Sequence, residues 1–193
     1  MNILKQMWYS YLGAFIKFGD FKTRSDKFEF WGFSLINNIV SFTLGYLALV
    51  NNPISILAFL YGIAVIIPGI TISIRRLHDV GRSGWWLAAA ALLFVARIPH
   101  LPSPVMSICI LVGFVASFYV FILTLCPSEK DNKYGPKPEE NKERLIFGNL
   151  LILFNFILPF ALLWAVGLEK TLAIRGVDND MQTTVSSPMH ISH

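Results

Sequence analysis

The stretch VMSICILVGFVASFYVFILTL, Val105–Leu125, contains 21 residues and no charged side chain. A helix that crosses the hydrocarbon core of a bilayer, roughly 30 Å thick, needs about 20 mostly apolar residues. Three other apolar runs, 30–50, 54–74 and 145–168, have this length, and a shorter run lies within 83–99. The sequence therefore predicts an all-α polytopic membrane protein, a helical bundle of about five transmembrane helices.

The composition agrees with a chain that lies mostly in lipid. Of its 193 residues 54% are hydrophobic and 15% charged, whereas soluble domains carry about 25% charged residues. The formal net charge of +4 comes from Lys and Arg in short segments beside the spans, where they act as topology signals and contact lipid phosphates. We therefore expect no nucleic-acid partner, and a single bundle uses the whole length.

The run at 83–99 is shorter than the other four. Its apolar part, Trp85–Ile98, has 14 residues and covers only about 21 Å as a helix. Trp85 and Trp86 would anchor it at one interface, and Arg97 could extend to the other. We interpret 83–99 as a short span buried in the bundle, with a re-entrant segment as the alternative.

The segment before the first span, residues 1–29, is expected to contain an amphipathic helix. Leu4, Met7, Trp8 and Tyr11 recur at spacings of three and four, which places them on one helical face. Such a helix lies in the headgroup plane or packs on the end of the bundle. Amphipathicity alone does not choose between lipid and protein as its apolar partner.

Basic residues predict the orientation. Thirteen of the 16 Lys and Arg residues lie before the first span, between the second and third spans, or in the loop 126–144. With five spans these segments share one side, which the positive-inside rule identifies as cytoplasmic. The N-terminus is then cytoplasmic, and the polar tail 169–193, which we expect to be disordered, is periplasmic.

Three polar stretches are too specific for generic loops: Arg24–Trp31 (RSDKFEFW), Arg75–Trp86 (RRLHDVGRSGWW) and Asn132–Pro138 (NKYGPKP). In these motifs the chain resembles the bacterial inner-membrane family called domain of unknown function 805, the YhaH-like proteins. The resemblance covers residues 18–138. It implies a compact four-span bundle in the inner membrane with a cytoplasmic N-terminus, and it implies no activity. The fifth span, 145–168, lies beyond the family domain.

The middle motif has two physical interpretations. In the first it is structural: cationic anchors, a tight turn at Gly81, a Ser83 cap for the next helix and an aromatic belt. In the second, its charged residues form a pocket for an anionic lipid or another anionic ligand. A catalytic pair of His78 and Asp79 is disfavoured, because adjacent residues on a helix do not face each other.

Candidate site residues follow from these motifs. The primary set is Arg75, Arg76, His78, Asp79, Arg82, Ser83, Trp85 and Trp86, and the supporting set is Arg24, Glu29, Trp31, Asn132, Tyr134, Gly135 and Pro138. We expect Glu29 and Asp79 to pair with arginines and so tie the three motifs together. Asp26 is a candidate N-cap for the first span, with Glu29 completing a capping box. Four asparagines within spans should hydrogen-bond between helices: Asn37, Asn38, Asn149 and Asn155.

The preferred function is a non-enzymatic binding or scaffold protein. It would engage anionic phospholipid or a membrane-protein partner, or a second copy of itself, through the Arg- and Trp-rich cytoplasmic face. A transporter or channel subunit is one alternative, although no Asp, Glu or Lys lies in mid-span. A lipid-headgroup-modifying enzyme is the other. We predict no catalytic residue, cofactor or metal site, since Cys109 and Cys126 lack zinc-site spacing.

Overall fold

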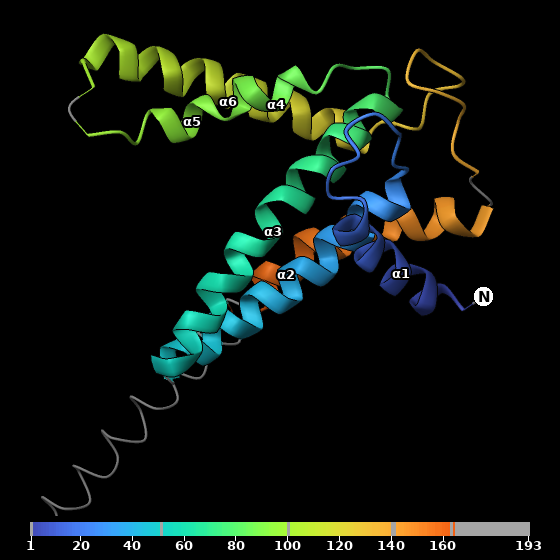
Figure 1. Ribbon diagram of the computed structural model, residues 1–193, viewed down its shortest axis with the longest axis horizontal. Coiled ribbons are helices and arrows are strands. Elements are labelled where there is room, and N and C mark those ends of the chain that lie inside the picture. The colour runs from blue at the N-terminus through green and yellow to red at the C-terminus, as the bar shows by residue number, and fades with distance from the viewer. Residues whose placement is uncertain (1, 51, 100, 140–141, 163, 165–193) are drawn as a thin grey trace, which may run out of the picture. The chain divides into compact units, whose positions relative to one another are not determined.

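The computed structural model describes residues 2–50, 52–99, 101–139, 142–162 and 164 (Figure 1). The chain divides into two compact units, Met1–Asn155 and Phe156–His193. Of the second unit, the described residues continue a helix to Leu162. The labelled helices are α1 (Ile3–Ile16), α2 (Lys27–Val50), α3 (Asn52–Asp79), α4 (Trp85–Ala90), α5 (Leu92–Val95) and α6 (Ser103–Leu125).

The prediction of an all-α polytopic fold is confirmed. Within the described ranges, four helices are long and apolar enough to cross a membrane: Lys27–Leu49, Pro53–Asp79, Ser103–Leu125 and Lys142–Leu162. Their surfaces carry large exposed apolar side chains, and only 11–28% of each most apolar window is buried inside the protein. Side chains of this kind need lipid rather than water as their surroundings.

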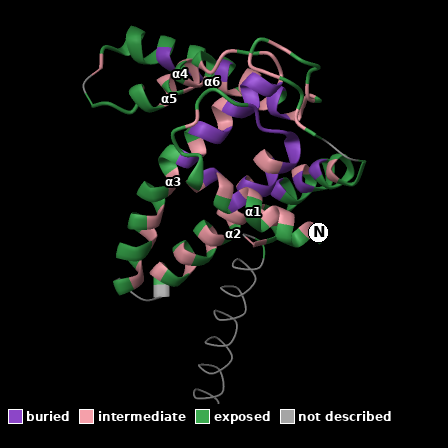
Figure 2. Ribbon diagram, turned by 45° about the vertical axis from the view of Figure 1, so that its right-hand side comes forward, coloured by how far each residue is buried: buried purple, intermediate pink, exposed green. Residues whose placement is uncertain are grey.

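Burial concentrates at one end of α2 and α3. The buried residues gather where α2 begins and α3 ends (Figure 2), and they include the polar run 24–27 and five charged or polar side chains of α3. α3 continues to Asp79, five residues past the predicted end of the second span at residue 74. The first half of the middle motif is therefore helical and not part of a loop.

α1 packs on α2 and α3 through one face. Tyr11 and Ala14 are buried with Phe33 of α2 and Ile72 of α3. The Tyr11 hydroxyl also lies 3.0 Å from the Tyr61 hydroxyl. Other apolar residues of α1, such as Leu4, Trp8 and Ile16, are exposed. The helix thus uses protein as the partner for one face, and other apolar side chains of the helix stay exposed.

The short apolar run is two helices and not the single helix expected over 83–99. α4 and α5 are separated by Ala91, whose ψ of −11° departs from α-helical values. They run antiparallel to α6, because Trp86 packs on Tyr119 at 4.6 Å while Leu93 lies against Gly113. A Cβ at Gly113 would lie 2.8 Å from the Leu93 backbone nitrogen, so glycine is required for this close approach.

The helix Lys142–Leu162 begins three residues before the predicted fifth span. Its first half packs on α2, where Leu151 is buried with Phe28 and Trp31. The rest of the predicted span 145–168 beyond residue 164, and the tail 169–193, lie outside the described residues.

Candidate functional site

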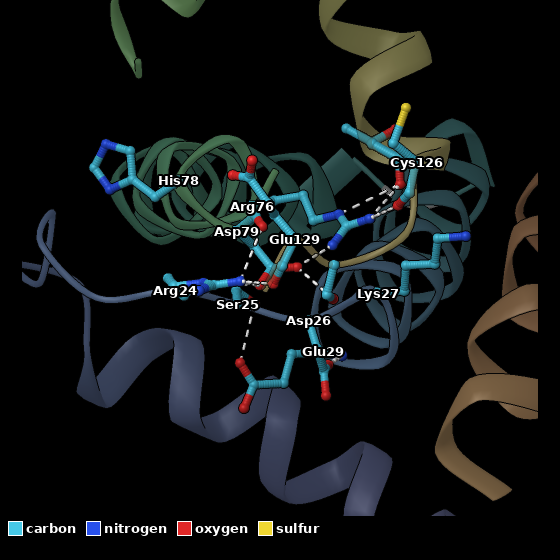
Figure 3. Close-up of polar contacts among 12 residues, drawn as sticks. Arg24, Ser25, Asp26, Lys27, Glu29, Arg76, His78, Asp79, Cys126 and Glu129 are labelled. Atoms are coloured by element: carbon cyan, nitrogen blue, oxygen red, sulfur yellow. Dashed lines mark hydrogen bonds and ion pairs between the residues drawn. The ribbon is translucent and has the colours of Figure 1, made fainter. Parts of the chain in front are cut away.

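Asp79, the last residue of α3, is the centre of a buried ion cluster (Figure 3). Its carboxylate is inaccessible to solvent and accepts hydrogen bonds from Arg24 Nε at 3.1 Å, from Arg76 Nη1 and from Ser128 Oγ at 2.6 Å. Two guanidinium groups thus share one carboxylate. A buried cluster of two guanidinium groups and one carboxylate is stable only if the other guanidinium N–H donors also find acceptors.

Arg24 satisfies its other donors with backbone carbonyls. Nη1 donates to Lys130 O at 3.0 Å and to Gly135 O at 2.8 Å, and Nη2 donates to the carbonyls of Asp79 and Glu129. One side chain from the first motif therefore fixes the path of the segment after α6 and that of the third motif.

Arg76 caps the C-terminal end of α6. Its Nε and Nη2 donate to Thr124 O at 3.3 and 3.1 Å, and Nη2 also donates to Cys126 O. The last carbonyls of a helix lack intrahelical donors and carry partial negative charge. Trp31 Nε1 donates to the same Thr124 carbonyl at 3.3 Å, so α2, α3 and α6 meet at this point.

Arg75 and Glu29 connect α3 with the start of α2. Arg75 Nη2 lies 3.4 Å from Glu29 Oε2 and donates to Arg24 O at 3.1 Å. The predicted N-cap is present, since Asp26 Oδ1 accepts from Glu29 N at 2.7 Å. The Glu29 carboxylate accepts from Ser25 Oγ at 3.0 Å.

The start of the helix Lys142–Leu162 also joins this cluster. Arg144 Nη2 lies 2.8 Å from Asp26 Oδ2. The starts of α2 and Lys142–Leu162 and the ends of α3 and α6 therefore lie on one face of the first unit. The expectation that Glu29 and Asp79 pair with arginines and tie the motifs together is confirmed.

This geometry changes the interpretation of the arginines. Arg24, Arg75 and Arg76 are at most 7% exposed, and the Arg24 and Arg76 donors named above meet protein oxygens. These contacts support the structural interpretation of Arg76 in the middle motif, and Arg24 of the first motif contributes to the same cluster. Arg82 is exposed, so it stays available to a ligand.

The third motif forms a tight turn that packs on α3. Asn132 and Gly135 form an isolated β-bridge, and Asn132 Nδ2 donates to His78 O at 3.0 Å. The Tyr134 ring stacks on the His78 ring at 3.7 Å. His78 points away from the ion cluster and Asp79 points into it (Figure 3), so they do not form a catalytic pair.

A large apolar groove of about 1530 Å³ lies between α3 and the α4–α6 segment. Ile70 and Ile74 of α3, Ala88 and Ala91 of the short helical segment, and Ile110 of α6 are among its apolar lining residues. His78, Ser83 and Tyr134 add polar groups, and Arg97 lines it as well.

The remaining candidates border this groove. Trp85 lines it and is 81% exposed, while Trp86 packs on Tyr119. The N-cap position of α4 is Gly84, without a side-chain cap hydrogen bond, so Ser83 is not the N-cap that the sequence predicted. Its Oγ accepts from Trp85 N at 3.4 Å. Gly84 allows α4 to approach α3, because a Cβ there would lie 2.9 Å from an Ile74 methyl group.

Several contributors were absent from the sequence-based set. Ser128, Glu129, the carbonyls of Thr124 and Cys126, and Arg144 complete the cluster. A polar residue soon after an apolar run was the available signal for Ser128, whereas the backbone carbonyls of Thr124 and Cys126 had no signal in the sequence. In the part of the chain that the structure describes, no group of three His, Cys, Asp or Glu residues is placed to hold a metal ion.

The fold and the cluster define a class of protein: an integral membrane protein whose long helices are joined at one end by buried arginine–carboxylate contacts. The family model described as "Protein of unknown function (DUF805)" matches residues 18–136, and the chain belongs to this family. It is 31% identical over 136 residues to "Inner membrane protein YhaH" of Escherichia coli (strain K12), covering 67% of this chain and 95% of that protein.

A second relative is "Inner membrane protein YhaI" of the same strain, 38% identical over 92 residues, which cover 47% of this chain and 75% of that protein. No solved structure matches the chain. The protein is thus an integral inner-membrane protein of a family of unknown function.

Proposed function

We propose that this protein is a non-enzymatic binding protein that holds an anionic phospholipid in the inner membrane. The observation that carries the proposal is the apolar groove between α3 and the α4–α6 segment. Its volume exceeds the roughly 300–1,000 Å³ of drug-sized ligand pockets, which suits the hydrocarbon chains of a lipid.

The charges near the polar part of the groove favour an anionic headgroup. Tyr134 lines the groove, and Lys133 Nζ lies 5.0 Å from the Tyr134 ring centroid. Lys133 and Arg82 are both exposed, so they can approach a phosphate without breaking a buried contact. Surface cations of this kind attract anionic lipid headgroups.

The same proposal includes an orientation. The segments that follow α3 and α6 and the one that precedes α2 carry most of the basic residues, which places them in the cytoplasm by the positive-inside rule. The N-terminus is then cytoplasmic and the C-terminus periplasmic, and the polar part of the groove faces the inner leaflet.

The test uses the full-length protein released from nanodiscs of equal parts phosphatidylglycerol and phosphatidylethanolamine, with retained lipids counted by native mass spectrometry. Ala91→Trp fills the groove and should reduce retained lipid at least threefold. Ala64→Trp, on an exposed position of α3 outside the groove lining, is the matched control and should retain lipid like the wild type.

A double variant tests the headgroup preference. Arg82→Gln with Lys133→Gln should abolish the preference for phosphatidylglycerol while leaving total lipid retention intact. If Ala91→Trp and Ala64→Trp retain equal amounts of lipid, the groove does not hold lipid and the proposal is wrong.

A further inference from the structure

A second cavity, separate from the apolar groove, lies among α1, α2, α3 and the start of the helix Lys142–Leu162. Its volume is about 200 Å³, and it shares no lining residue with the groove. It is lined mainly by polar and charged residues: Gln6, Tyr9, Ser10, Gly13, Ala14, Lys17, Glu29, Ile72, Arg75 and Arg144.

Arg75 is incompletely satisfied at this cavity. Its side chain is 4% exposed and donates from Nη2 to Glu29 and to Arg24 O. Its Nε, however, is buried without a hydrogen-bond partner among the described residues. A buried donor that lacks an acceptor costs about 1–3 kcal/mol, and a guanidinium N–H is a strong donor to oxyanions.

The local charge is also positive. Lys17, Arg75 and Arg144 line the cavity together with one carboxylate, Glu29. Asp26, which pairs with Arg144, neutralises a second charge. Asp20 also interacts electrostatically with Arg75. The excess positive charge is therefore that of the lining itself, three cations against one carboxylate, in a partly enclosed space where electrostatic attraction is stronger than in bulk water.

From this geometry we infer that the cavity binds a phosphate-type oxyanion. The anion accepts from Arg75 Nε and is attracted by Lys17 at the end of α1. Two sources supply this chemistry: the headgroup of an anionic phospholipid, or a free phosphate from the cytoplasm. Either anion joins α1 to α2 and α3, because its ligands come from different helices.

The inference does not depend on the proposed lipid groove, because the two cavities have different linings. Thermal stability of the purified full-length protein is the readout, measured in neutral detergent against inorganic phosphate, with chloride at matched ionic strength. A parallel series uses phosphatidylcholine nanodiscs with increasing phosphatidylglycerol. Saturable stabilisation by phosphate in detergent identifies a free anion, whereas saturable stabilisation in nanodiscs alone identifies the headgroup.

Lys17→Gln removes one charge from the cavity at an exposed position. It should raise the anion concentration needed for half-saturation about three- to tenfold. Lys5→Gln removes an equal charge from α1 outside the cavity and should leave it unchanged. Arg75→Lys keeps the charge but removes Nε–H, and should weaken binding about tenfold or more.

If Arg75→Lys fails to accumulate, the comparison of Lys17→Gln with Lys5→Gln decides. The inference is overturned if neither anion stabilises the wild type saturably, or if Lys5→Gln weakens the effect as much as Lys17→Gln. Arg82→Gln with Lys133→Gln should not alter this half-saturation concentration, so failure here is distinguishable from failure of the groove proposal.

Discussion

Asp79→Asn should be the most destabilising isosteric change in this protein. It keeps the side-chain volume but removes the charge that neutralises Arg24 and Arg76 at a fully buried position. The new amide NH₂ would also point at guanidinium donors or at the Ser128 hydroxyl. Removal of one partner from a buried ion pair costs about 3–5 kcal/mol, because the remaining charge is left uncompensated.

For a domain of this size each kcal/mol corresponds to roughly 2–4 °C in Tm, so a fall of about 6–20 °C is expected. Fluorescence-detected size-exclusion of heated samples in mild detergent measures it. Glu139→Gln, which removes a charge from an exposed residue outside the cluster, is the control and should shift Tm by less than about 2 °C.

A double-mutant cycle with Arg24→Met gives a sharper result. The two residues are in direct contact, 3.0 Å between Arg24 Nη2 and Asp79 Oδ1, so their effects should differ from additivity by at least about 1 kcal/mol. Additive effects together with a Tm loss below about 2 °C for Asp79→Asn would show that the cluster does not hold the helix ends together.

Three further outcomes are expected. Gly81→Ala should lower stability by about 1–3 kcal/mol, since Gly81 has φ of 70° and a Cβ would lie 2.0 Å from Glu129 Oε2. The control Gly45→Ala, at a position with open space around it, should not lower stability. Equal melting curves for the two variants would contradict this prediction. Asn155→Ala removes its hydrogen bonds to α2 and should cost about 0.6–2 kcal/mol in a thermal melt; no loss would mean that these bonds contribute nothing net. A reporter fused after Pro136 should be cytoplasmic, and a periplasmic signal would overturn the proposed orientation.

The sequence predicted the elements well because the membrane imposes a strong length rule. Runs of about 20 apolar residues are helices in lipid, and polar residues inside them must find partners. Asn38 Nδ2 indeed donates to Asn155 Oδ1 at 3.0 Å, and Asn37 and Asn149 accept from Tyr61 and Lys27. The hydrogen bonding expected of the intramembrane asparagines is confirmed.

The break at Ala91 was not predictable in the same way. A run of four alanines has the highest helix propensity, and nothing local interrupts it. The division into α4 and α5 lies where the segment packs closely on α6 at Gly113, which is a tertiary effect. The partners of Arg76 could not be predicted either. They are the backbone carbonyls of Thr124 and Cys126, and because every residue has a carbonyl, the residue type does not reveal which one accepts.

Burial separates the basic residues that hold the helix ends together from those that are accessible to a ligand. Arg24 and Arg76 use the planar, multi-donor geometry of guanidinium to hold α3, the end of α6 and the third motif in one arrangement. A lysine at either position would supply three donors from one point and could not bridge a carboxylate and carbonyls on opposite sides. The walls of the apolar groove belong to the same elements, so the cluster holds these walls in place. The buried side chains of the first and middle motifs therefore build a framework, while Arg82 of the middle motif and Lys133 of the third, both exposed, and the cavity beside Arg75 are where we propose that a ligand is recognised.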